Sequence, residues 1–385
     1  MRPSFKRTMY ACFVGYIVQA IVNNFVPLLF VTFQKSYQIP LSKITLLITI
    51  NFMIQLLIDL LSAGFVDKIG YKASVTIAHI CSAIGLFLLT ILPEVTADPF
   101  IGILIAVAIY AIGGGLLEVL ISPIIEACPT DNKEKAMSLL HSFYCWGHVG
   151  VVLISTIFFS TFGIANWKIL ARIWAVIPVL NGIIFLTSPI YSLHEEGEKG
   201  LSIRELCSMK IFWVVMLMMT CAGASEQVSK TVGDLAGPMA FAVLMGLARL
   251  LYGKYGEKID LKRFMIYSSI LCVISYLCIA FVPVPMLSLI GCAVCGFSVG
   301  IMWPGTFSIA SASIRGGGTA MFALLALAGD LGCSGGPTLA GFVSSSVGNN
   351  LRMGILAAIV FPVLLLIGIQ ICKKLSLIHI SEPTR

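Results

Sequence analysis

Long apolar runs, separated by short polar segments, cover most of this chain. A transmembrane helix needs about 20 apolar residues at a rise of about 1.5 Å each, and the runs of this length fall into two groups of six. The first six lie near residues 9–33, 43–66, 73–92, 99–127, 136–163 and 167–190. The second six lie near residues 211–227, 234–252, 263–282, 285–313, 318–347 and 352–372. This pattern predicts an all-α polytopic membrane protein with 12 transmembrane helices in two six-helix halves.

The polar segments predict how these helices are divided. We expect an N-terminal six-helix bundle, a cytoplasmic linker, a C-terminal six-helix bundle and a tail at residues 1–192, 193–210, 211–374 and 375–385, respectively. The tail resembles neither a span nor a charged terminus, so we interpret it as non-native sequence. The interval from Lys210 to Leu235 has to hold one span, a connection and the start of the next span. This short interval predicts a truncated region around helix 7.

The composition excludes a soluble globule. The chain is 58% hydrophobic and 11% charged, with a mean hydropathy of +0.98, which leaves too little polar surface to cover a water-soluble core. The net charge of +7 comes from scattered loop residues, so we expect no nucleic-acid partner. Of the 25 Lys and Arg residues, 19 lie in the termini and the even-numbered loops, and 6 (25 minus 19) lie in the other loops. This asymmetry predicts a multi-pass protein of the cell membrane with both termini in the cytoplasm.

The usual signatures of catalysis and cofactor binding are missing from the sequence. The 12 cysteines lie mostly inside apolar runs, and we interpret the Cys292-x-x-Cys295 pair as packing within a span. No P-loop is present, which argues against ATP-driven transport within this chain. No His, Cys or carboxylate group has metal-ligand spacing, and no acids or histidines cluster at one membrane face. We therefore expect neither an enzyme nor a bound metal or cofactor.

A charged segment between the second and third predicted spans carries the first family resemblance. Its sequence is Ala63-Gly64-Phe65-Val66-Asp67-Lys68-Ile69-Gly70-Tyr71-Lys72, and a later copy runs from Arg249 to Lys258. Both copies keep Lys, Gly and Lys at matching offsets, although Gly253 replaces the acid in the second. The first copy resembles the signature loop of the major facilitator superfamily, G-x-x-x-D-R-x-G-R-R/K, with Ala63 in place of the first Gly. The resemblance implies two six-helix halves that alternate access, with helix-end charges as a gate.

We expect the two charged loops and a nearby acid to form this gate. Its predicted members are Asp59, Asp67, Lys68, Gly70, Lys72, Arg249, Lys254, Gly256 and Lys258. The alternative is that the loop charges only obey the positive-inside rule.

The fourth predicted span carries a narrower resemblance. Its segment from Gly113 to Pro123 resembles the G-x-x-x-E-x-x-x-N-P stretch of the fucose permease-like branch, the sugar:proton symporters, with Ser122 in place of Asn. Glu118 lies in the middle of this apolar helix, where an ionisable side chain is costly unless it has a function or a partner. The resemblance implies that Glu118 binds and releases a proton, and we assign Asp330 in the Gly-rich eleventh span as a second proton-coupling acid. Either acid can instead be a structural group in an interhelical hydrogen bond or pair.

Further polar and aromatic residues inside spans are candidates for substrate binding. His141, Tyr144 and His148 share one helical face by their spacing, and a polar ring or an aromatic ring can contact a polyhydroxylated ligand. The full set is Asn23, Gln55, His141, Tyr144, Trp146, His148, Glu226, Gln227 and Trp303. For each of them, interhelical packing or hydrogen bonding is the alternative.

These observations predict a secondary active transporter. We expect it to move a small polar, sugar-like solute across the cytoplasmic membrane by alternating access, in symport with protons. Its expected partners are a small-molecule substrate, the proton and the lipid bilayer, and we expect a monomer. The alternatives are a proton-driven exporter of drugs or metabolites with the same fold, a non-transporting nutrient sensor and a polytopic membrane enzyme.

Overall fold

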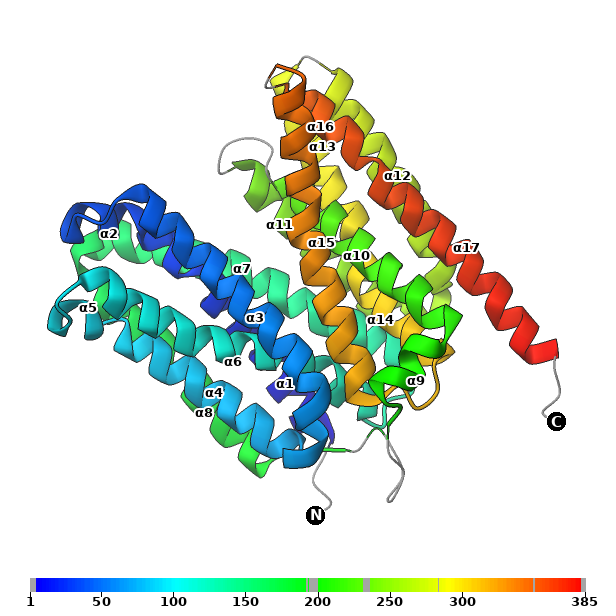
Figure 1. Cartoon of the computed structure of the whole chain (residues 1–385), viewed down its shortest axis with the longest axis horizontal. Helices are drawn as coiled ribbons and strands as arrows, with labels where there is room; N and C mark the ends of the chain where they lie inside the picture. The colour runs from blue at the N-terminus through cyan, green and yellow to red at the C-terminus, as the bar shows by residue number, and fades with distance from the viewer. Residues whose placement is uncertain are drawn as a thin grey trace. The chain divides into compact units, whose positions relative to one another are not determined.

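The computed structural model describes residues 5–191, 193, 200–230, 236–282, 284–348 and 350–381. Over this part of the chain the regular elements are helices (Figure 1). The first ten are α1 (Phe5–Asn24), η1 (Val26–Leu29), α2 (Phe30–Tyr37), α3 (Leu41–Ile69), α4 (Tyr71–Leu88), α5 (Leu92–Val95), α6 (Pro99–Ala127), α7 (Lys133–Phe162), η2 (Ile164–Asn166) and α8 (Trp167–Thr187). The others are α9 (Ile203–Ser208), α10 (Lys210–Lys230), α11 (Ala236–Tyr255), η3 (Gly256–Lys258), α12 (Leu261–Phe281), α13 (Pro285–Val299), α14 (Met302–Ser313), α15 (Gly318–Ser346), α16 (Leu351–Ala358) and α17 (Val360–Ser381).

Eleven segments within the described residues are long and apolar enough to cross a membrane. They match eleven of the predicted spans, and the remaining one, near 234–252, corresponds to α11. This helix has 20 residues and packs along α13, but Arg249 and Lys254 lower its hydropathy. The predicted truncation around helix 7 involves Thr231–Leu235, which lies outside the described residues. The stretch Lys210–Val228 qualifies as a membrane span.

Three predicted spans are each divided into separate helices in the structure. The first is a helix, a short 3₁₀ turn and a second helix, with Pro27 in the turn. Proline lacks a backbone N–H and therefore interrupts the α-helical hydrogen bonds. The tenth predicted span divides into α13 and α14 around Gly300 and Ile301, and the twelfth divides into α16 and α17 at Ile359.

Contacts group the chain into two compact units. The first contains Met1–Pro129 and Phe143–Leu193, and the second contains Thr130–Ser142 and His194–Arg385. The start of α7 therefore packs with the second unit, although it lies inside the predicted N-terminal half. The division into bundles at residues 1–192 and 211–374, with a linker between them, stays a prediction.

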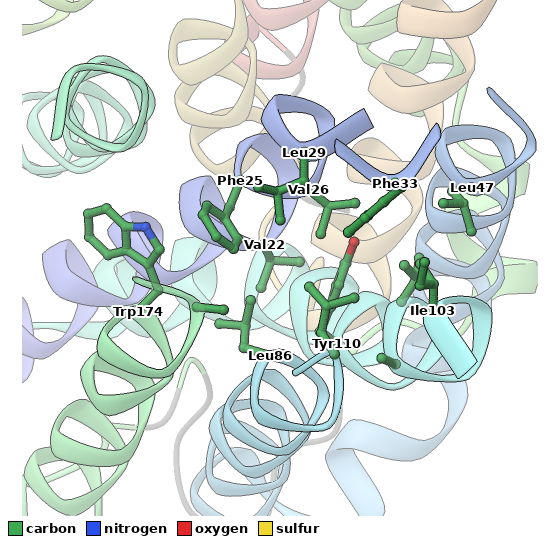
Figure 2. Packing of buried hydrophobic residues seen from close by; sticks show 14 of the residues in the cluster. Val22, Phe25, Val26, Leu29, Phe33, Leu47, Leu86, Ile103, Tyr110 and Trp174 are labelled. Atoms are coloured by element: carbon green, nitrogen blue, oxygen red, sulfur yellow. The ribbon is translucent and has the colours of Figure 1, made fainter. Parts of the chain in front are cut away.

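In the first unit, α6 is the central helix and packs against α1, α3 and α4. Figure 2 shows its apolar core, to which α1, η1 and α2 contribute several large side chains. These meet Leu86 of α4, Tyr110 of α6 and Trp174 of α8, which are all buried. Lipid is as apolar as this core, so the core stabilises the unit mainly by close packing and less by removing apolar surface from water.

In the second unit, α10 packs most extensively against α15. Glycines line this crossing, and a Cβ atom added at Gly223 or Gly332 would collide with the backbone of the opposite helix. Small residues let membrane helices approach closely, because no side chain separates their backbones. The crossing brings Glu226 of α10 and Asp330 of α15 toward the same region.

The structure corrects the interpretation of both charged segments as loops. Residues 63–69 are the last two turns of α3, and the connection to α4 is Gly70 alone. Gly70 has φ of +85°, a conformation that favours glycine. In the second copy, Arg249 lies inside α11, which ends at Tyr255, and the copy continues in η3 from Gly256. The two copies therefore begin as helix ends.

The last helix extends into the predicted tail. Helix α17 continues past residue 375 to Ser381, so the first seven residues of the tail extend the last helix. The interpretation of residues 375–385 as non-native sequence stays a prediction. Residues 382–385 lie outside the described part of the chain.

Candidate functional site: two buried acid clusters

The first acid cluster lies in the first unit and is centred on Glu118. This half-buried residue of α6 accepts a hydrogen bond at its Oε2 from Nε2 of Gln19 of α1, at 2.7 Å. Gln19 is buried, with 4% of its surface exposed. A carboxamide can donate to an ionised carboxylate through its N–H and can accept from a protonated one through its oxygen. The pair therefore suits a carboxyl group that changes its protonation state.

A carboxamide group lies one helical turn farther along α1. Asn23 Oδ1 accepts hydrogen bonds from Gln55 Nε2 at 2.8 Å and from Asn51 Nδ2 at 3.5 Å. Residues four apart share a helical face, which explains why Gln19 and Asn23, and likewise Asn51 and Gln55, lie on the same side of their helices.

Two oxygens of this group retain hydrogen-bonding capacity. Asn51 Oδ1 and Gln55 Oε1 are buried and accept no hydrogen bond from the described residues. A cavity of about 20 Å³ beside Asn23 and Asn51 has room for about one water molecule. The group can therefore accept hydrogen bonds from a hydroxyl group or a water molecule.

Aromatic residues of α1 and α7 adjoin this cluster. The hydroxyl of Tyr16 lies 2.8 Å from Oγ of Ser122, one turn beyond Glu118 on α6. The ring of Tyr16 meets Tyr144 of α7 edge to face, with centroids 6.4 Å apart. Trp146 and His148 follow on α7 and are both half-buried. Of the predicted substrate residues, Tyr144 thus contacts α1 and, through Tyr16, is connected to α6, the helix of Glu118.

His141 does not join Tyr144 and His148, although all three lie on α7. Its segment belongs to the second unit, where its ring stacks with Phe307 of α14 at 5.8 Å. Its backbone oxygen accepts a hydrogen bond from Arg249 Nη1 at 3.1 Å. The predicted face of three residues is therefore divided between two packing environments, because α7 contributes to both units.

The second acid cluster lies in the second unit and contains an ion pair. Arg249 of α11 is 2% exposed, and its Nη2 lies 3.3 Å from Glu226 Oε2. Its Nε also donates to the backbone oxygen of Gly300 at 2.7 Å, where α13 ends before α14 begins. Arg249 therefore lies in the interior of the unit, and its predicted gating role stays a prediction. Gln227, beside Glu226, is half-buried.

Asp330 of α15 is the third charged member of this cluster. It is 8% exposed and interacts electrostatically with Glu226. Its Oδ2 is buried and accepts no hydrogen bond from the described residues. The preceding Gly329 lies against the ring of Trp303, which is also buried. Two carboxyl groups and one guanidinium are neutral together only when one proton is bound, so the cluster has the composition of a proton site.

The predicted gate residues occupy two different environments. Asp59 is fully buried in α3, whereas Asp67, Lys68 and Lys72 are exposed around Gly70.

In the second copy, Lys254 and Lys258 are exposed and Gly256 is buried. Glu257 forms an ion pair with Lys135 of α7, and the hydrogen bond from this lysine lowers the pKa of Glu257. Tyr252 OH donates to Glu134 Oε2 at 2.8 Å. The end of α11 and the start of α7 are thus joined by polar contacts within the second unit.

Sequence reasoning missed the partners of the acids. The pairs Gln19–Glu118 and Arg249–Glu226 were not predicted, because the residues of each pair are at least 23 positions apart in the chain. A buried-face argument on α1 would have found Gln19, since it is a polar residue inside an apolar span. The Cys292 and Cys295 thiols are buried; Cys295 lies 3.8 Å from Cys272, and Cys292 faces the Gly237 carbonyl. No metal-binding group of three or more ligands occurs among the described residues.

Comparison with known proteins decides the family. The model of the Major Facilitator Superfamily matches residues 11–233, more than half of the chain. The chain belongs to the Major Facilitator Superfamily. It is therefore a multi-pass membrane transporter, and the predicted major facilitator fold is confirmed. A search of curated proteins gave no match.

Solved structures of this superfamily share the fold over nearly their whole length. The fucose:proton symporter of E. coli is 15% identical, with a TM-score of 0.82 over 96% of this chain and 99% of that one. The proton:xylose symporter XylE is 13% identical, with a TM-score of 0.77 over 94% of each chain. The human organic anion transporter MFSD10 is 14% identical, with a TM-score of 0.74 over 96% of this chain and 100% of that one. At these identities the likeness shows the fold alone.

Proposed function

We propose that this transporter carries a small polar, sugar-like solute across the cytoplasmic membrane by alternating access, in symport with protons. We further propose that it works as a monomer with both termini in the cytoplasm. The observation that carries the proposal is Glu118, a carboxyl group inside an apolar helix that is hydrogen-bonded to a buried neutral carboxamide, Gln19. A charge at this depth is retained where it has a function.

The proposed proton step uses the change in charge at Glu118. Protonation removes a negative charge from a half-buried position inside an apolar helix, and Gln19 can hydrogen-bond to either form of the carboxyl group. Substrate binding and proton binding are coupled if both occur on the same group of helices. The carboxamides of Asn23 and Gln55 lie on α1 and α3, which both pack against α6, the helix of Glu118.

A polyhydroxylated substrate fits the polar groups of the first unit. The unused buried oxygens of Asn51 and Gln55 accept hydrogen bonds, which hydroxyl groups donate. Aromatic rings such as Tyr144 and Trp146 pack on the apolar faces of sugar rings. Two solved symporters with this fold carry fucose and xylose by their names, which agrees with a sugar-like solute.

The second unit contributes the second proposed proton site, Asp330. With Glu226 and Arg249 it forms a buried cluster that one bound proton makes neutral. We propose that Glu118 is the coupling acid and that Asp330 tunes the charge of the second unit. Gln227, Trp303, His141 and His148 remain proposed contacts for the substrate.

The deciding experiment compares net accumulation with exchange in proteoliposomes. A screen of sugars and polyols first identifies a substrate by uptake driven by an inward proton gradient. Glu118→Gln is then expected to abolish this uptake while it retains exchange of labelled for unlabelled substrate, because exchange requires no net proton transfer. Glu94→Gln is the matched control, since Glu94 is an exposed acid of the same unit, and it should retain both activities. Normal proton-driven accumulation by Glu118→Gln would refute the role of Glu118.

A further inference from the structure

A cavity of about 810 Å³ lies in the second unit, apart from both acid clusters. It is bounded by the starts of α7, α10 and α12 and by the end of α14. Its lining residues are Glu134, Met209, Ile211, Ile259, Asp260, Leu261, Lys262, Ser308, Ile309, Ala312, Ser313 and Arg315. This volume is within the range of small-molecule binding sites.

Charges of both signs line this cavity without neutralising each other. Within the described part of the chain, Lys262 and Arg315 form no ion pair with Glu134 or Asp260. Each acid has one oxygen engaged: Glu134 Oε2 accepts from Tyr252 OH at 2.8 Å, and Asp260 Oδ1 accepts from the backbone N–H of Arg263 at 2.7 Å. The second oxygen of each acid and both cationic groups are available to a ligand. A ligand with one charge would leave half of this set uncompensated.

The uncharged residues that line the cavity indicate the chemistry of the rest of the ligand. Ile211, Leu261 and Ile309 are buried apolar residues, so the ligand has an apolar part. Ser308 is 6% exposed and supplies a hydroxyl group at the cavity wall. A ligand with an anionic group, a cationic group and an apolar body therefore matches the lining.

The position of the cavity favours an amphiphile that lies at a membrane surface. It adjoins the first residues of α10 and α12, which are both membrane-spanning segments. Trp213, two residues beyond Ile211, is 56% exposed and donates from Nε1 to the Cys207 oxygen at 2.8 Å. Exposed tryptophan is enriched where transmembrane helices meet the lipid headgroups. The cavity thus lies at the level at which a phospholipid presents its head.

We propose that this cavity binds the zwitterionic head of an amphiphile, with its phosphate on Lys262 and Arg315 and its ammonium on Glu134 and Asp260. An ammonium group donates hydrogen bonds to carboxylates, which a trimethylated amine cannot do. The site therefore selects an aminophosphate head, either of a membrane lipid or of a soluble molecule. The proposal is independent of the transported solute and of the coupling ion.

The test measures the melting temperature of the purified full chain in detergent. Phosphatidylethanolamine is expected to raise it more than phosphatidylcholine, which has no ammonium hydrogens, and more than phosphatidylglycerol, which has no cation. Soluble phosphoethanolamine is tested in parallel: a shift of its own identifies a soluble source, and a shift seen only with the lipid identifies a membrane source. Equal shifts with all three lipids and no shift with phosphoethanolamine would overturn the proposal.

Charge-removing variants locate the effect. Lys262→Gln with Arg315→Gln, and Glu134→Gln with Asp260→Asn, should each weaken binding at least about tenfold, since charged hydrogen bonds are lost. Asn caps a helix about as well as Asp, and Gln retains an oxygen for Tyr252, so both variants should fold. Arg263→Gln is the control, because Arg263 is on α12 but does not line the cavity. Binding by both double variants that equals the binding of the unaltered chain would place the ligand elsewhere.

Discussion

The two acid clusters solve the burial of a carboxylate in different ways. In the first unit, one hydrogen bond to Glu118 comes from the neutral carboxamide of Gln19. In the second, the hydrogen bond to Glu226 comes from the guanidinium of Arg249, and a second acid, Asp330, lies nearby. A neutral donor lets the carboxyl group gain or lose a proton without leaving a buried cation behind. A charged donor neutralises one carboxylate and leaves the charge of the other acid uncompensated.

The largest expected effect follows from removing the cation of the second cluster. Arg249→Met leaves Glu226 buried without its ion pair, and breaking a buried pair in this way costs about 3–5 kcal/mol. Thermal unfolding in detergent measures the loss. The double variant Arg249→Met with Glu226→Gln should recover at least half of it, because the orphaned charge is gone. A single variant as stable as the original chain would show that the pair contributes nothing.

Removing the neutral donor of the first cluster should have a smaller effect. Gln19→Leu removes one hydrogen bond from the half-buried carboxyl group of Glu118, which costs about 1–3 kcal/mol. Because the protonated carboxyl group is easier to bury than the ionised one, the loss should shrink as the pH of the unfolding experiment is lowered. In Glu118→Gln, the same Gln19→Leu change should cost the same at every pH. A loss that is independent of pH in both backgrounds contradicts an ionisable partner for Gln19.

The third expected effect is small and separates the two acids of the second cluster. Asp330→Asn keeps the shape of the side chain, and Oδ2 of Asp330 has no hydrogen bond from the described residues to lose. The substitution also removes the repulsion between Asp330 and Glu226. We expect a change within about 1 kcal/mol, against a clear loss for Glu226→Gln. Equal losses for the two variants in thermal unfolding would remove this distinction.

An exposed ion pair gives the smallest effect and a baseline for the buried one. The hydrogen bond from Lys168 and the hydrogen bond from Tyr37 lower the pKa of Glu94, so the ionised form stabilises the folded state. This contribution is present above the ordinary pKa of glutamate and is lost as the pH falls through the lowered value. Because the pair is exposed, Glu94→Gln should cost at most about 1 kcal/mol at neutral pH and nothing in strong acid. A difference that persists in acid would contradict the assignment to this ion pair.

Helix existence was predictable, whereas helix ends and side-chain partners were not. Apolar length identified the spans, because the bilayer imposes a minimum length on every crossing helix. The extension of α3 to Ile69 was missed because charged residues at a helix end resemble a loop in the sequence. The burial of Arg249 was missed because its partner, Glu226, lies on another helix.

Among the candidate site residues, the buried acids were predictable from the sequence, whereas their partners were not. Glu118 and Asp330 were identified from the sequence, because an acid inside an apolar span is conspicuous. Gln19 was not identified, because its importance comes from its contact with a residue 99 positions away. His141 was assigned to the face of Tyr144 by helical spacing, which says nothing about the helices that pack against each turn of α7.

The sequence by itself determined that the chain crosses the membrane many times and which acids are buried in it, because hydrophobic length and a lone charge are local properties. Tertiary structure decided which donor each acid meets. That choice depends on the crossings of α1 with α6 and of α10 with α11 and α15, where residues far apart in the chain approach within hydrogen-bond distance or electrostatic range. Helix packing sets these crossings through small residues such as Gly223 and Gly332, and no periodicity along a single helix encodes their partners.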